Sequence, residues 1–156
     1  MSTFNPEAFL NMEVDEDLAT AAVPVAEGQW NDPIIKVVDA REVQRKDGSG
    51  SFISLDCRVE IHDPELKLEM DYEGDRVPSA RYSMILDTDE NGALRTEGDA
   101  NWRLGALFEA CGMERPYLLV NLKGASAGSC IVKQELNEKT QSMVSNIVSM
   151  SEDRRN

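Results

Sequence analysis

The amino-acid sequence predicts a mainly β protein with one helix, and three observations support this fold class. Side chains expected to be buried and side chains expected to face water alternate over residues 52–61 with a period of two, which is typical of a strand with one buried face. Turn-forming segments rich in Gly, Asp and Asn separate several further runs rich in Ile, Val and Leu. Apolar residues recur at helical spacing up to about Cys111, in a helix that Asp99 is expected to cap and Gly112 to terminate. The length of 156 residues suits one domain.

The first 30 residues are expected to form an extended, acidic arm. They contain Pro6 and Pro24 and show no sustained hydrophobic period. A short helix is compatible with the sequence near Asn5–Asn11, because an asparagine cap is followed by proline, which suits the first helical position. Residues 31–150 are then the folded domain, and residues 151–156 are a short polar tail.

Within the domain we expect five strands and one helix. The first two strands form a hairpin, because residues 46–50 hold an Asp-Gly pair and a second glycine, which adopt positive φ at low cost. The polar segment His62–Asp75 interrupts the pattern and holds at most a short extra strand at Leu66–Met70. The expected strands are Ile34–Arg45, 52–61, Arg76–Asp87, Cys130–Leu136 and Met143–Met150, with the helix between the third and the fourth.

This order of elements is that of the OB-fold, a five-stranded Greek-key barrel with its helix between strands three and four. The main alternative is a β-sandwich with one inserted helix. An OB barrel binds ligands on strands two and three and on the loops that join strands one to two and four to five. Candidate binding residues are therefore sought on those segments.

The charge balance limits how this protein can meet nucleic acid. The net charge is −13, and residues 1–33 hold seven acidic residues with no Lys or Arg. The remaining chain holds 22 acidic and 16 basic residues. Phosphate affinity comes from local Lys and Arg, so any nucleic-acid contact must use a local basic face.

The composition also favours a reduced, intracellular setting. No apolar run approaches the length of a membrane span, and no secretory leader pattern is present. The three cysteines, Cys57, Cys111 and Cys130, are odd in number and show no close pairing. Cys57 and Cys111 lie at apolar positions of a strand and a helix, where we expect small, buried thiols.

No set of residues predicts catalysis, a cofactor or a metal. His62 is the only histidine and has no clustered cysteine, which argues against a zinc site or a His-based catalytic set. The glycine-rich segment 123–129 lacks the Gly-Lys-Ser/Thr ending of a phosphate loop. Asp87–Gly92 matches the first half of a calcium-binding EF-hand loop, but the twelfth position is Gly98 instead of Glu. An ordinary Asp/Asn turn is the favoured interpretation, and the protein is expected not to be an enzyme.

A groove for single-stranded nucleic acid is the main site hypothesis. Such grooves combine aromatic rings that stack on bases with cations along the backbone. Phe52 lies on the polar face of its strand, where a ring could serve this purpose. Trp30 could also stack, although anchoring the arm to the domain is the favoured role. The candidate cations are Arg45 and Lys46 in the first loop, Arg58, Arg81 and Lys133 on strands, and Lys139 in the last loop. The alternative is that Phe52 covers one end of the barrel and the cations are scattered surface charge.

Several short motifs resemble a known family. The entry Val23–Trp30, the helix ending Leu107–Gly112, the step Leu122-Lys123-Gly124 and an asparagine at Asn137 or Asn146 are similar to phage-encoded OB-fold proteins of the single-stranded DNA-binding type. The resemblance spans about residues 23–150 and implies non-catalytic DNA binding in replication or recombination. Members of that family often end in an acidic tail, whereas this chain ends Glu152-Asp153-Arg154-Arg155-Asn156 and carries its acidic cluster at the N-terminus.

Three function classes follow from these observations. The first is a phage-type single-stranded DNA-binding protein in the host cytoplasm, with single-stranded DNA as its partner. The second is a virion structural protein, such as a capsid-decorating or cement protein, that docks on neighbours or on itself through the N-terminal arm. The third is a DNA-mimicking inhibitor, against which the 16 dispersed basic residues argue.

Overall fold

A computed structural model describes residues 3–18 and 23–155 of the chain. Most of the elements are strands, and the longest are the two that form the expected hairpin. The elements in chain order are α1 (Pro6–Leu10), β1 (Gly28–Asn31), β2 (Pro33–Gln44), β3 (Ser51–Ile61), α2 (Pro64–Glu69), β4 (Ser79–Leu86), α3 (Trp102–Ala110), the 3-10 helix η1 (Leu119–Leu122), β5 (Ser129–Asn137) and β6 (Ser142–Ser151). The mainly β class with few helices is confirmed.

The described strands form one mixed sheet of six strands in the order β1-β5-β6-β4-β3-β2. β4 and β6 pair in parallel, and the other neighbours are antiparallel. The expectation of a five-stranded closed barrel is corrected here, because the sheet has six strands and does not close. The extra strand arises at Asp32, whose φ of 59° bends the chain so that β1 pairs with β5 and β2 pairs with β3.

The core lies on the inward face of the sheet and beneath α3. Alternate residues of β3, Leu55, Cys57, Val59 and Ile61, are buried, as the period of two predicts. α3 packs against β6 and β4 with Leu104, Leu107 and Phe108, which form its apolar stripe. Tyr82 of β4 is also buried, in the same cluster of core residues.

Two local predictions are wrong in the loop regions. Leu66–Met70 does not form a strand, because Asp63 caps a short helix there. Its carboxylate accepts a hydrogen bond from the Glu65 amide at 2.9 Å, and Pro64 occupies the first helical position. The cap of α3 is Asn101 and not Asp99. Asn101 has a φ of 58°, and its side chain bonds to Asp87 and Arg95 and not to the helix.

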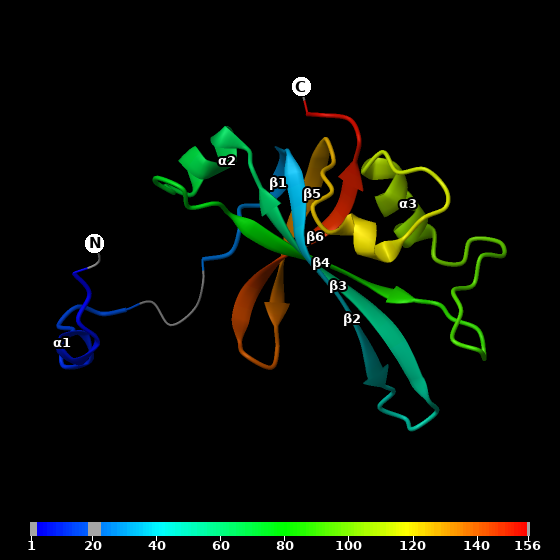
Figure 1. Cartoon of the computed structure of the whole chain (residues 1–156), viewed down its shortest axis with the longest axis horizontal. Coiled ribbons are helices and arrows are strands. Elements are labelled where there is room, and N and C mark those ends of the chain that lie inside the picture. Colours follow the sequence, from blue (N-terminus) through cyan, green and yellow to red (C-terminus); the bar gives the residue numbers. More distant parts are fainter. Residues whose placement is uncertain (1–2, 19–22, 156) are drawn as a thin grey trace.

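The N-terminal arm extends away from the sheet, and α1 lies at the far end of the molecule from α3 (Figure 1). The short helix with which the sequence is compatible forms here as α1, and the Asn5 side chain accepts hydrogen bonds from the amides of Glu7 and Ala8. None of residues 3–18 is buried. The chain first enters the core at Val25.

The C-terminal tail packs back onto β1. Arg155 donates from its backbone amide to the side chain of Asn31 at 2.7 Å and from its guanidinium to the Gln29 carbonyl at 2.7 Å. The guanidinium also pairs with Glu65 and lies over the Trp30 ring, 5.2 Å from its centroid. Arg154 pairs with Asp32 at 2.6 Å. Both arginines near the chain end therefore have partners within the domain.

Candidate nucleic-acid interface

A groove of about 710 Å³ lies on the outward face of the sheet, lined by β2, β3 and β4 and by the β5–β6 hairpin. Figure 1 shows the β2–β3 and β5–β6 hairpins extending away from the end of the molecule that carries the C-terminus. The groove lining includes Arg58 of β3 and Arg81 of β4. Val23 and Pro24, where the arm meets the domain, also line it.

Arg58 and Arg81 are directly opposite each other in the β3–β4 pairing. Like charges in this arrangement destabilise a sheet. Arg81 is partly compensated by Asp56, whose carboxylate lies 2.9 Å from Nη2. Arg58 has only one long contact, from Nη2 to the Ser79 hydroxyl at 3.4 Å. The positive charge of the exposed Arg58 guanidinium is therefore not balanced by an ion pair within the described residues.

Asp56 organises the polar side chains beside these arginines. It pairs with Arg41 at 2.9 Å and accepts a hydrogen bond from the Ser83 hydroxyl at 2.6 Å, in addition to its contact with Arg81. Partial burial by itself raises the pKa of the Asp56 carboxyl. The hydrogen bonds from Ser83, Arg81 and Arg41 outweigh that effect and lower the pKa to about 2. The Asp56 carboxylate is therefore charged at neutral pH, and it holds Arg41 and Arg81 on the outward face.

Exposed apolar side chains also border the groove. Val37, Leu136 and Met143 line it, and about half of each side chain's surface is exposed. None of these three residues was predicted from the sequence. Residue 37 has the same place in a period of two as the buried Pro33 and Ile35, so strand alternation would put Val37 in the core. The β-bulge between Ile35 and Val37 turns Val37 to the outward face. Leu136 and Met143 pair across the β5–β6 hairpin, which only the strand register shows.

Phe52 and Arg45 lie at the outer end of the β2–β3 hairpin and do not line the groove. The Arg45 guanidinium carbon is 5.4 Å from the centroid of the half-buried Phe52 ring, a cation–π contact. Lys46 is exposed in the adjoining turn. The structure thus brings Phe52 and Arg45 together, but outside the groove that lies on the outward face of the sheet.

The other predicted cations and Trp30 are more distant from this surface. Lys133 on β5 and Lys139 in the β5–β6 turn are exposed, but neither lines the groove. Trp30 is only 6% exposed, and its indole nitrogen donates to the Ala26 carbonyl at 2.9 Å. This geometry is that of an anchor between the arm and the domain, and the ring has no free face for a base.

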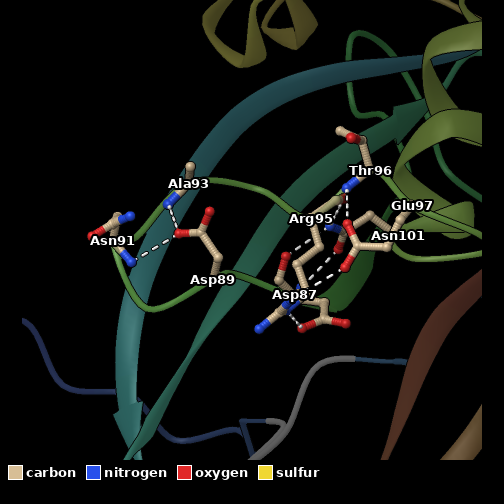
Figure 2. A network of polar contacts seen from close by, with 8 residues as sticks. All are labelled: Asp87, Asp89, Asn91, Ala93, Arg95, Thr96, Glu97 and Asn101. Carbon is tan, nitrogen blue, oxygen red and sulfur yellow. Dashed lines mark hydrogen bonds and ion pairs between the residues drawn. The ribbon is translucent and has the colours of Figure 1, made fainter.

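The Asp87–Gly92 loop uses its oxygen atoms within the protein (Figure 2). One Asp89 oxygen accepts from the amides of Asn91 and Ala93, at 2.8 and 3.0 Å, which is an Asx turn. Arg95 contacts both Asp87 and Glu97. Over residues 3–18 and 23–155, no group of three or more His, Cys, Asp or Glu side chains is arranged to hold a metal ion.

The three cysteines are free thiols. Burial raises the pKa of Cys57 and Cys111 to about 11 and that of Cys130 to about 12. These thiols are therefore protonated at neutral pH and are poor nucleophiles.

Comparison with known proteins finds no matching family model, no similar curated protein and no similar solved structure. Within the described residues, the helices are too short and too polar for any of them to span a membrane. The function is therefore argued from the geometry of the groove.

Proposed function

We propose that this protein binds single-stranded DNA, without catalysis, in the groove between the β2–β3 and β5–β6 hairpins. The observation that carries the proposal is the Arg58–Arg81 pair in a groove of an otherwise acidic protein. Two adjacent guanidiniums cost stability in the free protein. A phosphate placed between them would relieve that repulsion and accept charge-assisted hydrogen bonds.

The connectivity of the sheet supports an OB-type arrangement. In this interpretation β1 and β2 are the two halves of one bent first strand, and β3, β4, β5 and β6 are the second to fifth strands. The order across the sheet is then 1-4-5-3-2-1, and α3 connects the third strand to the fourth, as in an OB-fold. Two backbone hydrogen bonds connect Ile35 with the segment just before β5, from Ile35 to Ala125 at 2.8 Å and from Gly124 to Ile35 at 2.7 Å. In this interpretation the groove occupies the surface that OB-folds use for oligonucleotides.

Each part of the groove has a proposed role. Arg58 and Arg81 neutralise phosphates, and the exposed side chains of Val37, Leu136 and Met143 contact bases. Phe52, held under Arg45, extends the surface for a longer strand. Asp39 and Glu135 also line the groove, so affinity depends on the local arginine pair and not on a positive field over the whole face.

The test is fluorescence anisotropy of a labelled oligo-dT strand at low and at high salt. Wild-type protein is expected to bind, more weakly at high salt. Arg58→Ala should weaken binding and reduce the salt slope by about one, because one phosphate contact is lost. Arg58→Lys should restore most of that slope, and Phe52→Ala should weaken binding to long strands more than to short ones.

Arg76→Ala is the matched control, since Arg76 is exposed but lies outside the groove, over Tyr72. Absence of binding at low salt, or equal losses for Arg58→Ala and Arg76→Ala, would contradict the proposal. In that case we favour the second function, that of a virion structural protein, because the arm carries exposed apolar side chains that could dock on a neighbouring protein.

A further inference from the structure

A second groove lies on the opposite side of the molecule from the arm, beside α3. Its volume is about 1110 Å³, and it is lined by residues 94–96, by three residues of α3 and the two residues before that helix, and by residues 115–119. Leu104 and Phe108 form part of its floor, and the Tyr117 ring stacks on Phe108 with centroids 4.5 Å apart. Leu118 on its rim is 56% exposed. This groove, called here the α3 groove, is apolar and open.

The charge of the α3 groove is unusual for this chain. Its lining contains Arg95 and Arg115, and no Asp or Glu among the described residues lines it. Acidic residues outnumber basic ones by 29 to 16 in the sequence, so a lining with only cations is notable. Arg95 already contacts Asp87 and Glu97, whereas Arg115 has no ion pair within the described residues. An apolar segment with acidic flanks would complement this surface.

The N-terminal arm has that chemistry. Within residues 3–18, five residues are acidic and none is basic. The same segment carries large apolar side chains that are mostly exposed, namely Phe4, Phe9, Leu10, Met12, Val14 and Leu18. The Phe4 and Phe9 rings are 5.5 Å apart, so α1 presents a small aromatic cluster to solvent. A five-residue helix is marginal by itself, and burial of its apolar side is what would stabilise it.

We infer that residues 3–18 of one chain dock in the α3 groove of a second copy, so that two chains exchange arms. The second copy is the occupant because α1 and α3 lie at opposite ends of the same chain (Figure 1). Reciprocal exchange uses the same two surfaces twice, as a two-fold symmetric dimer requires. The inference goes beyond the proposed DNA binding and uses no residue of the Arg58–Arg81 groove.

The test uses full-length chains in sedimentation velocity over about a hundredfold range of protein concentration. Wild type should shift from monomer to dimer. Phe9→Glu in the arm and Leu118→Glu in the groove should each raise the dimer dissociation constant at least about tenfold, because each places a charge in an apolar contact. Val120→Glu is the matched control, since Val120 is also exposed in the same segment, 72% against 56% for Leu118, but does not line the groove. Circular dichroism confirms that each variant folds.

Mixing the two defective variants distinguishes arm exchange from other dimers. Phe9→Glu keeps an intact groove and Leu118→Glu keeps an intact arm, so a mixture should form heterodimers through one arm and groove, although each variant alone stays monomeric. A wild type that is monomeric at every concentration, a dimer unaffected by either variant, or a mixture that does not associate would each overturn the inference. None of these outcomes bears on oligo-dT binding by the other groove.

Discussion

Asp56 is a partly buried carboxylate that joins two arginines on the outward face of the sheet. Its contacts with Arg41, Arg81 and Ser83 lower its pKa from 3.8 to about 2. The folded protein therefore holds the charged carboxylate more favourably than the unfolded chain does. This stability is present above about pH 4 and is lost as the pH falls towards 2.

Asp56→Asn keeps the shape of the side chain and removes its charge. We expect it to lower the free energy of unfolding at pH 7 by about 2 kcal/mol, and the difference from wild type should vanish near pH 2. The same change should strengthen oligo-dT binding, because Arg81 loses its competing anion. Urea unfolding at both pH values and the anisotropy titration measure these effects.

Asp39→Asn is the control for Asp56→Asn. Asp39 lies opposite Asp56 in the β2–β3 pairing and forms no ion pair within the described residues. Removing its charge also removes a repulsion between neighbouring carboxylates, so stability at pH 7 should stay equal or rise. A loss equal to that of Asp56→Asn would show that the ion-pair network does not stabilise the fold.

The packing of the C-terminal tail against the start of β5 depends on one glycine. Gly128 precedes β5, and its amide donates to the Ser151 carbonyl at 2.8 Å. A Cβ at this position would lie 2.6 Å from the Glu152 carbonyl carbon and 2.7 Å from that of Asp153. These are backbone atoms of the tail, so an added side chain must displace it.

Gly128→Ala is expected to destabilise the protein by roughly 1–3 kcal/mol, because the tail loses its contacts with β1. Gly105→Ala is the matched control. Gly105 lies within α3, and a Cβ there would meet no atom within 4 Å. That change should instead stabilise the helix by up to about 1 kcal/mol. Thermal unfolding of the two variants should shift in opposite directions, and a neutral Gly128→Ala would contradict the packing of the tail.

At the scale of the whole molecule, the two chain ends differ in how they join the domain. Residues 3–18 bury none of their side chains. The tail bonds to β1 through Arg155 and Asn31, and it brings Arg154 to Asp32 at the bend between β1 and β2. The tail therefore belongs to the folded unit, whereas the arm is an appendage.

Deleting residues 1–22 should leave the melting temperature unchanged at concentrations where the protein is monomeric. Deleting residues 152–156 should lower it by several degrees, because the Arg155 contacts with Gln29, Glu65 and Trp30 are lost. Differential scanning calorimetry of both truncated chains measures the contrast. Equal effects of the two deletions would contradict this division of the molecule.

Much of the local structure of this protein could be predicted from its sequence, although the helix α2 and the cap of α3 could not. The period of two over residues 52–61 identified β3, the Asp-Gly turn identified the β2–β3 hairpin, and the spacing of Leu104, Leu107 and Phe108 identified α3. Asn5 and Pro6 marked a possible start for α1. These features depend on backbone dihedrals and on neighbours a few residues away, which a single sequence displays.

The tertiary structure alone decided how these elements meet. It formed a separate strand, β1, before the bend at Asp32, buried Trp30 against the tail, and placed Arg58 opposite Arg81 in one groove. The sequence marked both arginines as polar-face residues but could not show that they are neighbours. Strand register and burial come from contacts between residues far apart in the chain, and these contacts leave no periodic signal in the residues that make them.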